Sequence, residues 1–141
     1  MALSFTPDDV NELVRTEFPA AYAAGNRCLE LGDGTALGRW AFDESELRPG
    51  AYISGPTLFA LADCTFWFAT FTVLGLEPMA VTSELSIRFL RPAQDGDVLA
   101  RATLNSVSSR RLVGTIEMWV EGTPDRLVAV AQGSYARPSP D

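Results

Sequence analysis

The sequence predicts an α+β domain in which a curved antiparallel sheet wraps one long central helix. Residues 54–76 form an almost uninterrupted apolar run that is long enough for a buried helix. Residues 81–135 then alternate between apolar and polar side chains, which is the period of half-buried strands. The chain has 141 residues, 47% hydrophobic and 21% charged, which is the size and composition of one globular domain. We therefore expect a single domain over residues 1–141.

A short helix over about residues 7–18 is the first predicted element. Thr6 is a helix-capping residue, Pro7 suits the first helical position, and two acids follow in the first turn. Pro19 cannot continue the helix. We expect this helix to cover an edge or an end of the sheet.

A hairpin and a loop are expected before the central helix. Strands over residues 27–31 and 35–42 flank a Gly-Asp-Gly turn, and residues 43–50 are polar and contain Pro and Gly. After the central helix, one strand and then three long strands joined by short turns predict an antiparallel meander. These later strands, and the frayed tail that follows them, are expected at residues 81–89, 98–108, 112–120, 127–135 and 137–141.

The central helix is predicted to begin after Ser54, which is a capping residue with Pro56 close behind it, and to end near Gly75. A membrane span is the first alternative, because the helix is apolar on all sides. Asp63 in its middle argues against a span, since a carboxylate at the bilayer centre costs roughly 2.5–3.5 kcal/mol. The uncharged runs on either side of Asp63 are each too short to cross alone. We therefore expect no membrane contact.

The composition excludes several kinds of site. The chain has no histidine, so it has no histidine base, no histidine ligand and no Ser–His or Cys–His pair. Cys28 and Cys64 form neither a CxxC pair nor a disulfide framework, and the carboxylates lack metal-ligand spacing. A net charge of −7 without a basic cluster argues against nucleic acid. We expect no metal, no cofactor and, because the N-terminus lacks a signal-peptide pattern, a cytoplasmic location.

Asp63 is the candidate functional residue, because it is the only charged side chain in the apolar run. Buried carboxylates are uncommon unless they are paired or functional, and burial makes a carboxylate a better general base. The alternative is a structural role, in which Asp63 bonds a neighbouring backbone group or an arginine.

Three segments resemble the hotdog-fold acyl-CoA thioesterases of the PaaI (phenylacetate-degradation) type. The segment from Ser54 to Asp63 resembles the signature at the start of the family's central helix, roughly His-Gly-Gly, six residues and then Asp. Residues 87–97 resemble the family's next strand and turn, and residues 128–135 resemble its last strand. The likeness covers about residues 27–136 and implies the hotdog fold and the hydrolysis of an acyl-CoA thioester.

The resemblance also implies roles for individual residues. Asp63 would be the base or nucleophile, and the backbone N–H of Gly55 would polarise the thioester carbonyl. The strand hydroxyl that helps to hold the water would be Thr82, or Ser83 if the register slips by one residue. A helix N-terminus with its free N–H groups suits a developing oxyanion, which supports the role of Gly55.

Two positions depart from the family pattern. Ser54 stands where the family has His, and Arg48 stands where it usually has Asn. In the family these two side chains help to orient the substrate and neighbouring groups. Ser54 and Arg48, together with Ser83, are therefore the predicted substrate-binding residues.

The spacing of Gly55 and Asp63 predicts an oligomer. The two residues are eight positions apart, so on one helix they lie roughly 12 Å apart along the axis. They cannot both reach one carbonyl. A site that combines Gly55 of one subunit with Asp63 of another requires two antiparallel central helices, and we expect a homodimer or homotetramer.

The predicted function is an acyl-CoA thioesterase, which takes acyl-CoA as substrate and needs no cofactor. One alternative is a non-catalytic protein that binds acyl thioesters without hydrolysing them. Another is a purely structural oligomer in which Asp63 serves packing.

Overall fold

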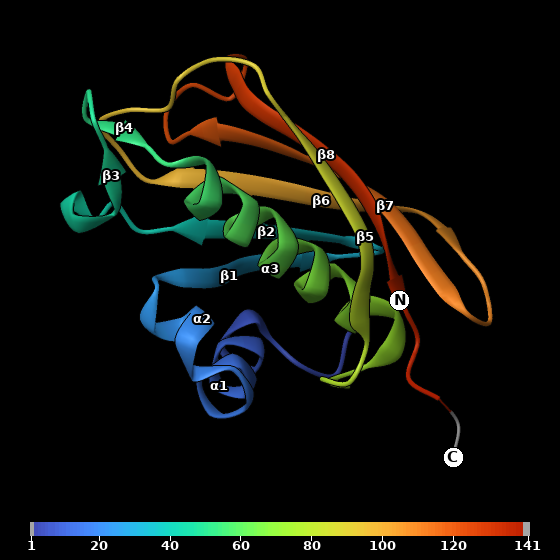
Figure 1. The fold of residues 1–141 in the computed structure, drawn as a ribbon. Coiled ribbons are helices and arrows are strands. Elements are labelled where there is room, and N and C mark those ends of the chain that lie inside the picture. Colours follow the sequence, from blue (N-terminus) through green and yellow to red (C-terminus); the bar gives the residue numbers. More distant parts are fainter. Residues whose placement is uncertain (1, 140–141) are drawn as a thin grey trace.

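The computed structural model describes residues 2–139, which form a six-stranded antiparallel sheet wrapped around one long helix (Figure 1). The helices are α1 (Pro7–Glu17), α2 (Pro19–Ala23) and the central helix α3 (Gly55–Leu74). The sheet order is β1-β2-β6-β7-β8-β5, with strands β1 (Asn26–Gly32), β2 (Thr35–Trp40), β5 (Val81–Phe89), β6 (Val98–Val107), β7 (Arg111–Val120) and β8 (Leu127–Ala136). The predicted α+β architecture is confirmed.

Helix α3 begins and ends at the residues that the sequence indicates. The Ser54 side chain accepts a hydrogen bond from the backbone N–H of Thr57, and Pro56 occupies the first turn. Gly75 ends the helix with φ of 80°, a left-handed conformation that favours glycine. The β1–β2 hairpin and the long strands form one curved sheet, and α3 packs against its inner face (Figure 1).

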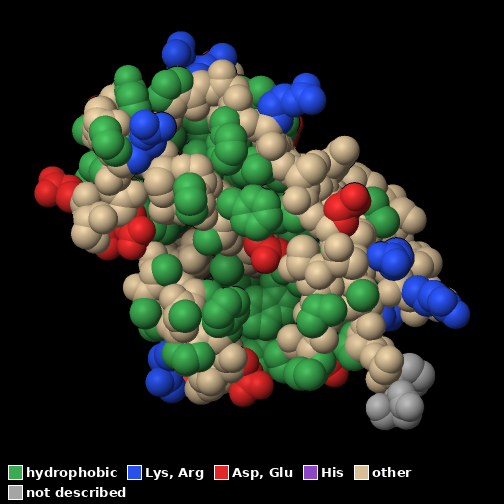
Figure 2. All heavy atoms as spheres, viewed as in Figure 1, with side chains coloured by type: hydrophobic (Ala, Val, Ile, Leu, Met, Phe, Trp, Pro, Cys, Tyr) green, Lys and Arg blue, Asp and Glu red, His purple; other side chains and the backbone are tan. Residues whose placement is uncertain are grey.

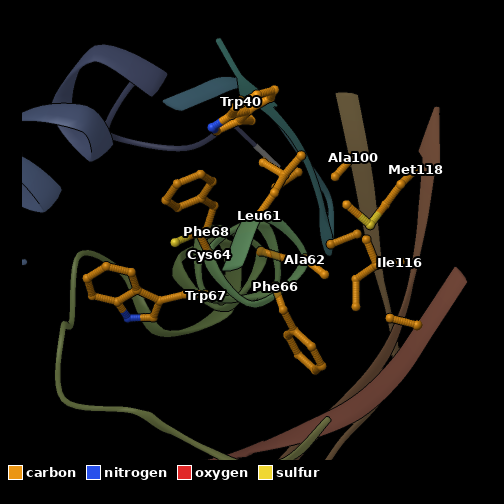
Figure 3. Close-up of a cluster of buried hydrophobic side chains, with 14 of the residues drawn as sticks. Trp40, Leu61, Ala62, Cys64, Phe66, Trp67, Phe68, Ala100, Ile116 and Met118 are labelled. Carbon is orange, nitrogen blue, oxygen red and sulfur yellow. The ribbon is translucent and has the colours of Figure 1, made fainter. Parts of the chain in front are cut away.

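The core lies between α3 and the sheet. Ala62 on α3 faces Ile116 and Met118 on β7, while Leu61 points toward Trp40 and Phe66 packs against Tyr135 of β8 (Figure 3). All of these side chains are at most 4% exposed. Because the helix presents large side chains here, the sheet must curve around it rather than lie flat against it.

Close contact between α3 and the hairpin depends on a glycine in β2. A Cβ atom at Gly38 would lie 2.2 Å from Thr65 Oγ1 and 3.2 Å from Thr65 Cβ. Thr65 itself is fully buried and donates its hydroxyl to the Leu61 carbonyl. Glycine in the strand therefore lets the helix approach the backbone of the sheet.

Helix α1 covers the edge strand β1, as the sequence predicts. The Asn11 side chain donates to the Cys28 carbonyl at 2.9 Å and accepts from the Cys28 N–H at 2.7 Å. These two bonds satisfy backbone groups at the β-bulge between Cys28 and Glu30, where regular pairing with β2 is interrupted. Val10 and Val14 of α1 are fully buried where the helix packs on the domain.

Two details differ from the sequence predictions. The first helix ends at Glu17, and a second short helix, α2, follows because Pro19 suits a first helical position as well as it ends the preceding helix. Residues 43–50 are not only a loop, since they contain a 3₁₀ turn (Glu44–Glu46) and the strand β3 (Leu47–Arg48), which pairs with β4 (Tyr52–Ile53). The predicted tail at residues 137–141 lies partly outside the described residues.

Within one chain, α3 is not covered on all sides, although its composition predicts complete burial. Phe59 and Val73 are 38% and 39% exposed, and strand β5 is exposed along most of its length. Helix α3 is long and apolar enough to cross a membrane, but most of it is the buried core of this fold. Strand β5, whose outer edge is free, runs beside α3 (Figure 1).

Candidate active site

Asp63 lies in the middle of α3 and receives two hydroxyl hydrogen bonds on one carboxylate oxygen. Thr82 on β5 donates to Asp63 Oδ1 at 2.7 Å, and Tyr135 on β8 donates to the same oxygen at 2.6 Å. The Tyr135 hydroxyl also lies 3.0 Å from the backbone oxygen of Asp63. The other carboxylate oxygen, Oδ2, has no hydrogen-bond or ion-pair partner within residues 2–139. Contrary to the expectation of full burial, Asp63 is only half-buried.

A β-bulge places Thr82 at the carboxylate. Strands β5 and β8 pair regularly from Glu84 to Phe89, and the odd-numbered side chains Leu85 and Ile87 pack toward α3. Between Thr82 and Glu84 the register shifts, so Ser83 has no partner on β8 and Thr82 lies opposite Tyr135. The extra residue therefore turns an even-numbered side chain toward the helix.

Ser83 lies on the outer face of the sheet instead. Its hydroxyl lies 2.8 Å from Ser134 Oγ and accepts from Arg111 Nη1 at 2.9 Å. Of the two hydroxyls that the sequence leaves open, Thr82 is the one that contacts Asp63. The contacts of Ser83 hold the bulge from the outside.

A cavity of about 400 Å³ opens beside Asp63, and Figure 2 shows an apolar hollow on this face. Its wall includes Phe18 from the α1–α2 junction, Trp67 from α3 and Met79 from the segment before β5. Phe18 meets Trp67 edge-on, with ring centroids 6.2 Å apart. A polar carboxylate at the rim of an apolar cavity is the usual arrangement of a small-molecule site.

The aromatic residues of α3 divide between core and cavity. Phe66, Phe68 and Phe71 are at most 1% exposed and belong to the core. Trp67 points away from the sheet (Figure 3) and lines the cavity. The sequence alone could not separate these roles, because all four residues lie on one apolar helix.

Cys64 also lines the cavity, but it is not a nucleophile. Burial raises the pKa of the Cys64 thiol to about 12, and the neighbouring Asp63 carboxylate adds to the shift. The thiol is therefore protonated at neutral pH, and a thiolate is the form that attacks.

The N-terminus of α3 forms a second group of polar residues. Ser54 caps the helix, and within residues 2–139 the Gly55 N–H has no acceptor. The Phe89 ring covers Gly55, and a Cβ atom there would lie 3.3 Å from the ring. Arg48 is exposed on β3, whose partner strand β4 leads directly into the helix.

The structure therefore brings together Asp63 and Thr82, but not Asp63 and Gly55 of the same chain. Both Gly55 and Asp63 lie on the continuous helix α3, about 12 Å apart at 1.5 Å per residue. Ser54 and Arg48 lie near the Gly55 end.

Tyr135 is the residue at this site that the sequence analysis did not single out. The sequence gives one signal for it: Tyr135 shares a face of the last strand with Ala131 and Gly133, and this face is turned toward the helix. Alternation shows which face a residue lies on, but it does not show which helix residue it meets.

The comparison with known proteins assigns the chain to a family. The family model described as the thioesterase superfamily matches residues 50–126, which include α3, Asp63 and Thr82. The chain belongs to the thioesterase superfamily.

Solved structures place the chain more closely within this family. A protein from Silicibacter sp. TM1040, described as a candidate thioesterase, is 30% identical over 99% of this chain and 96% of that one, with a TM-score of 0.86. A variant of the phenylacetic acid degradation protein PaaI from Thermus thermophilus is also 30% identical, over 85% of this chain and 99% of that one, with a TM-score of 0.74. These similarities confirm the resemblance to PaaI-type hotdog thioesterases.

More distant structures share the fold. The PaaI protein of Escherichia coli is 23% identical over 96% of this chain and 97% of that one, with a TM-score of 0.78. Among curated proteins no match was found.

The cap at Ser54 leads to a stability prediction. Replacing Ser54→Ala removes the side-chain acceptor for the Thr57 N–H, so it should lower the free energy of unfolding by about 1 kcal/mol. Ser54→Thr keeps a capping hydroxyl and is the matched control. Chemical denaturation of both variants measures the difference, and an unchanged stability in Ser54→Ala would show that the hydroxyl does not cap the helix.

Proposed function

We propose that the protein is an acyl-CoA thioesterase, which hydrolyses an acyl-CoA to the free acid and CoA. The observation that carries the proposal is that the two oxygens of the Asp63 carboxylate have different surroundings. Oδ1 is occupied by two hydroxyl donors, and Oδ2 is left free beside an apolar cavity. A fixed carboxylate with one free oxygen suits a general base that binds water.

In the proposed reaction, Asp63 Oδ2 accepts a proton from a water molecule, and the water oxygen attacks the thioester carbonyl carbon. A C–O bond forms and the carbonyl oxygen becomes an oxyanion. The C–S bond then breaks, and the CoA thiolate takes up the proton that Asp63 holds. Thr82 fixes the carboxylate through its hydroxyl.

The oxyanion needs a donor, and we propose the Gly55 N–H of a second subunit. This N–H lies at a helix N-terminus, where the macrodipole favours negative charge, and Pro56 beside it has no N–H to offer. Because Gly55 and Asp63 lie too far apart on one helix, the donor must come from another copy of the chain.

Two-fold symmetry then determines how the helices meet. If Gly55 of each subunit lies beside Asp63 of the other, the two antiparallel helices cross at the midpoint between these residues, which is Phe59. Phe59 is 38% exposed and lies four residues from each of them, on the same side of α3. The exposed residue Phe59 therefore lies where the two-fold axis of a shared site would pass.

A second copy would also cover the other exposed apolar residues of this region. Val81 is 59% and Phe89 is 50% exposed, both on the free edge strand β5. An uncovered edge strand with apolar residues favours association with another chain. The proposal is a homodimer, alone or within a homotetramer, with two shared sites.

Two of the three predicted substrate-binding residues, Ser54 and Arg48, fit the CoA side of such a site, whereas Ser83 lies on the outer face of the sheet. Ser54 and Arg48 lie at the Gly55 end of α3, and Arg48 is an exposed cation that suits the phosphates of CoA. The apolar cavity beside Asp63 suits an apolar acyl group. Both cysteines are free, which is consistent with the proposed cytoplasmic location.

Asp63→Asn tests the proposed activity. Incubation with a panel of acyl-CoAs, followed by release of free thiol, should show hydrolysis by the wild-type protein. Asn is nearly isosteric but cannot accept a proton, so the variant should lose at least about 100-fold in kcat. Asp33→Asn, at an exposed turn, is the control and should keep full activity.

Two results would contradict the proposal. Asp63→Asn with most of its kcat intact would make Asp63 structural. A wild-type protein that releases no thiol from any acyl-CoA, yet gains thermal stability with one of them, would instead be the non-catalytic binding protein.

Phe59→Asp tests the dimer. A charge at the two-fold axis of an apolar helix pair would face its own copy, so the dimer should dissociate and the activity should be lost with it. Sedimentation velocity measures the oligomeric state. Val107→Asp, at the exposed end of β6, is the matched control and should leave the dimer intact. A Phe59→Asp protein that stays dimeric and active would show that α3 does not form the interface.

A further inference from the structure

The hydroxyl of Tyr135 is the second donor to Asp63 Oδ1, and the proposed mechanism uses it only to occupy that oxygen. It lies 2.6 Å from Asp63 Oδ1, at the end of β8. The Tyr135 ring is 4% exposed and packs against Phe66, with ring centroids 4.8 Å apart. The ring is therefore fixed by the core, and its hydroxyl is held at the carboxylate.

The hydroxyl of Tyr135 is a donor to Asp63 whenever the carboxylate is ionised, because a carboxylate only accepts. Burial raises the pKa of Tyr135 above its ordinary value, and the nearby Asp63 raises it further. The phenol therefore stays protonated over the pH range in which the site would work.

Within residues 2–139, Asp63 has no cation beside it. The ionisable groups around the cavity are Asp63 itself, Glu17 from α1, Cys64 from α3 and Tyr135 from β8. None of them carries positive charge, and no ion pair of Asp63 is found among the described residues. The two hydroxyl donors on Oδ1 are therefore the groups that hold this carboxylate in place.

The two donors also fix which oxygen is free. The terminal torsion of an aspartate is broad, so a lone carboxylate can exchange its two oxygens by rotation. Thr82 approaches Oδ1 from β5 and Tyr135 approaches it from β8. Rotation would break both bonds, so Oδ2 stays available to a water molecule.

We propose that Tyr135 is a positioning residue for Asp63, which holds the carboxylate in one rotamer so that Oδ2 can act as the base. The catalytic part of this inference rests on the proposed thioesterase function. The coupling between Tyr135 and the charge of Asp63 does not, and it can be measured without a substrate.

Tyr135→Phe tests the coupling, since it keeps the packed ring and removes only the hydroxyl. A hydrogen bond to a charged carboxylate is stronger than one to a neutral acceptor. The loss of Tm on Tyr135→Phe should therefore be larger in the wild-type background than in the Asp63→Asn background, where the acceptor is a neutral amide. Tyr22→Phe is the control, because the Tyr22 hydroxyl donates no hydrogen bond within residues 2–139 and its ring lies under Arg27.

The kinetic test separates kcat from KM. With one donor fewer, the Asp63 carboxylate is less firmly held in the rotamer that presents Oδ2 to the water. In Tyr135→Phe, kcat should fall about tenfold, a part of the effect of a whole general base, while KM changes by less than about twofold. Tyr22→Phe should retain the wild-type kcat and KM.

The outcomes separate the two proposals. A loss of Tm in Tyr135→Phe that is equal in the wild-type and Asp63→Asn backgrounds, with an unchanged kcat, would show that Tyr135 only packs and would overturn the inference. A wild-type protein that hydrolyses no thioester, but in which the Tm loss depends on Asp63, would overturn the proposed function and leave the positioning role standing.

Discussion

A helix that is apolar on every side must be covered on every side, and the sheet of one chain covers only part of α3. The other features of the molecule follow from this constraint. The strands curve to enclose Leu61, Ala62 and Phe66, and Gly38 lets β2 approach the helix backbone. The part of α3 that stays exposed includes Phe59, which lies between Gly55 and Asp63. The surface that a second chain would cover therefore also contains the polar groups of the proposed site.

The same burial explains how one carboxylate is tolerated on this helix. Asp63 is half-buried, and it satisfies Oδ1 with hydroxyls from β5 and β8 rather than with a cation. These neutral donors satisfy one carboxylate oxygen without an ion pair, and within residues 2–139 the second oxygen has no partner.

The sequence predicts helix α1, helix α3 and the six strands of the large sheet because each depends on a local pattern. Ser54, Pro56 and Gly75 mark the ends of α3, and alternation marks the strands. The bulge at Ser83 could not be predicted, since the shift in register depends on how β5 pairs with a strand some fifty residues away. Tyr135 was missed for a related reason: its partner, Asp63, lies 72 residues earlier, and no local period connects a strand to one position on a helix.

The shared site is the central claim, and subunit complementation tests it most directly. Asp63→Asn removes the base from one subunit, and Gly55→Pro removes the donor N–H; Ser54 before it already has the extended ψ of 152° that a following proline requires. Each variant alone should be inactive. After dissociation and reassociation of an equal mixture, half of the dimers are mixed and each contains one intact site, so activity should return to about one quarter of the wild-type value. A mixture that stays inactive, although mixed dimers form, would contradict a site built from two subunits.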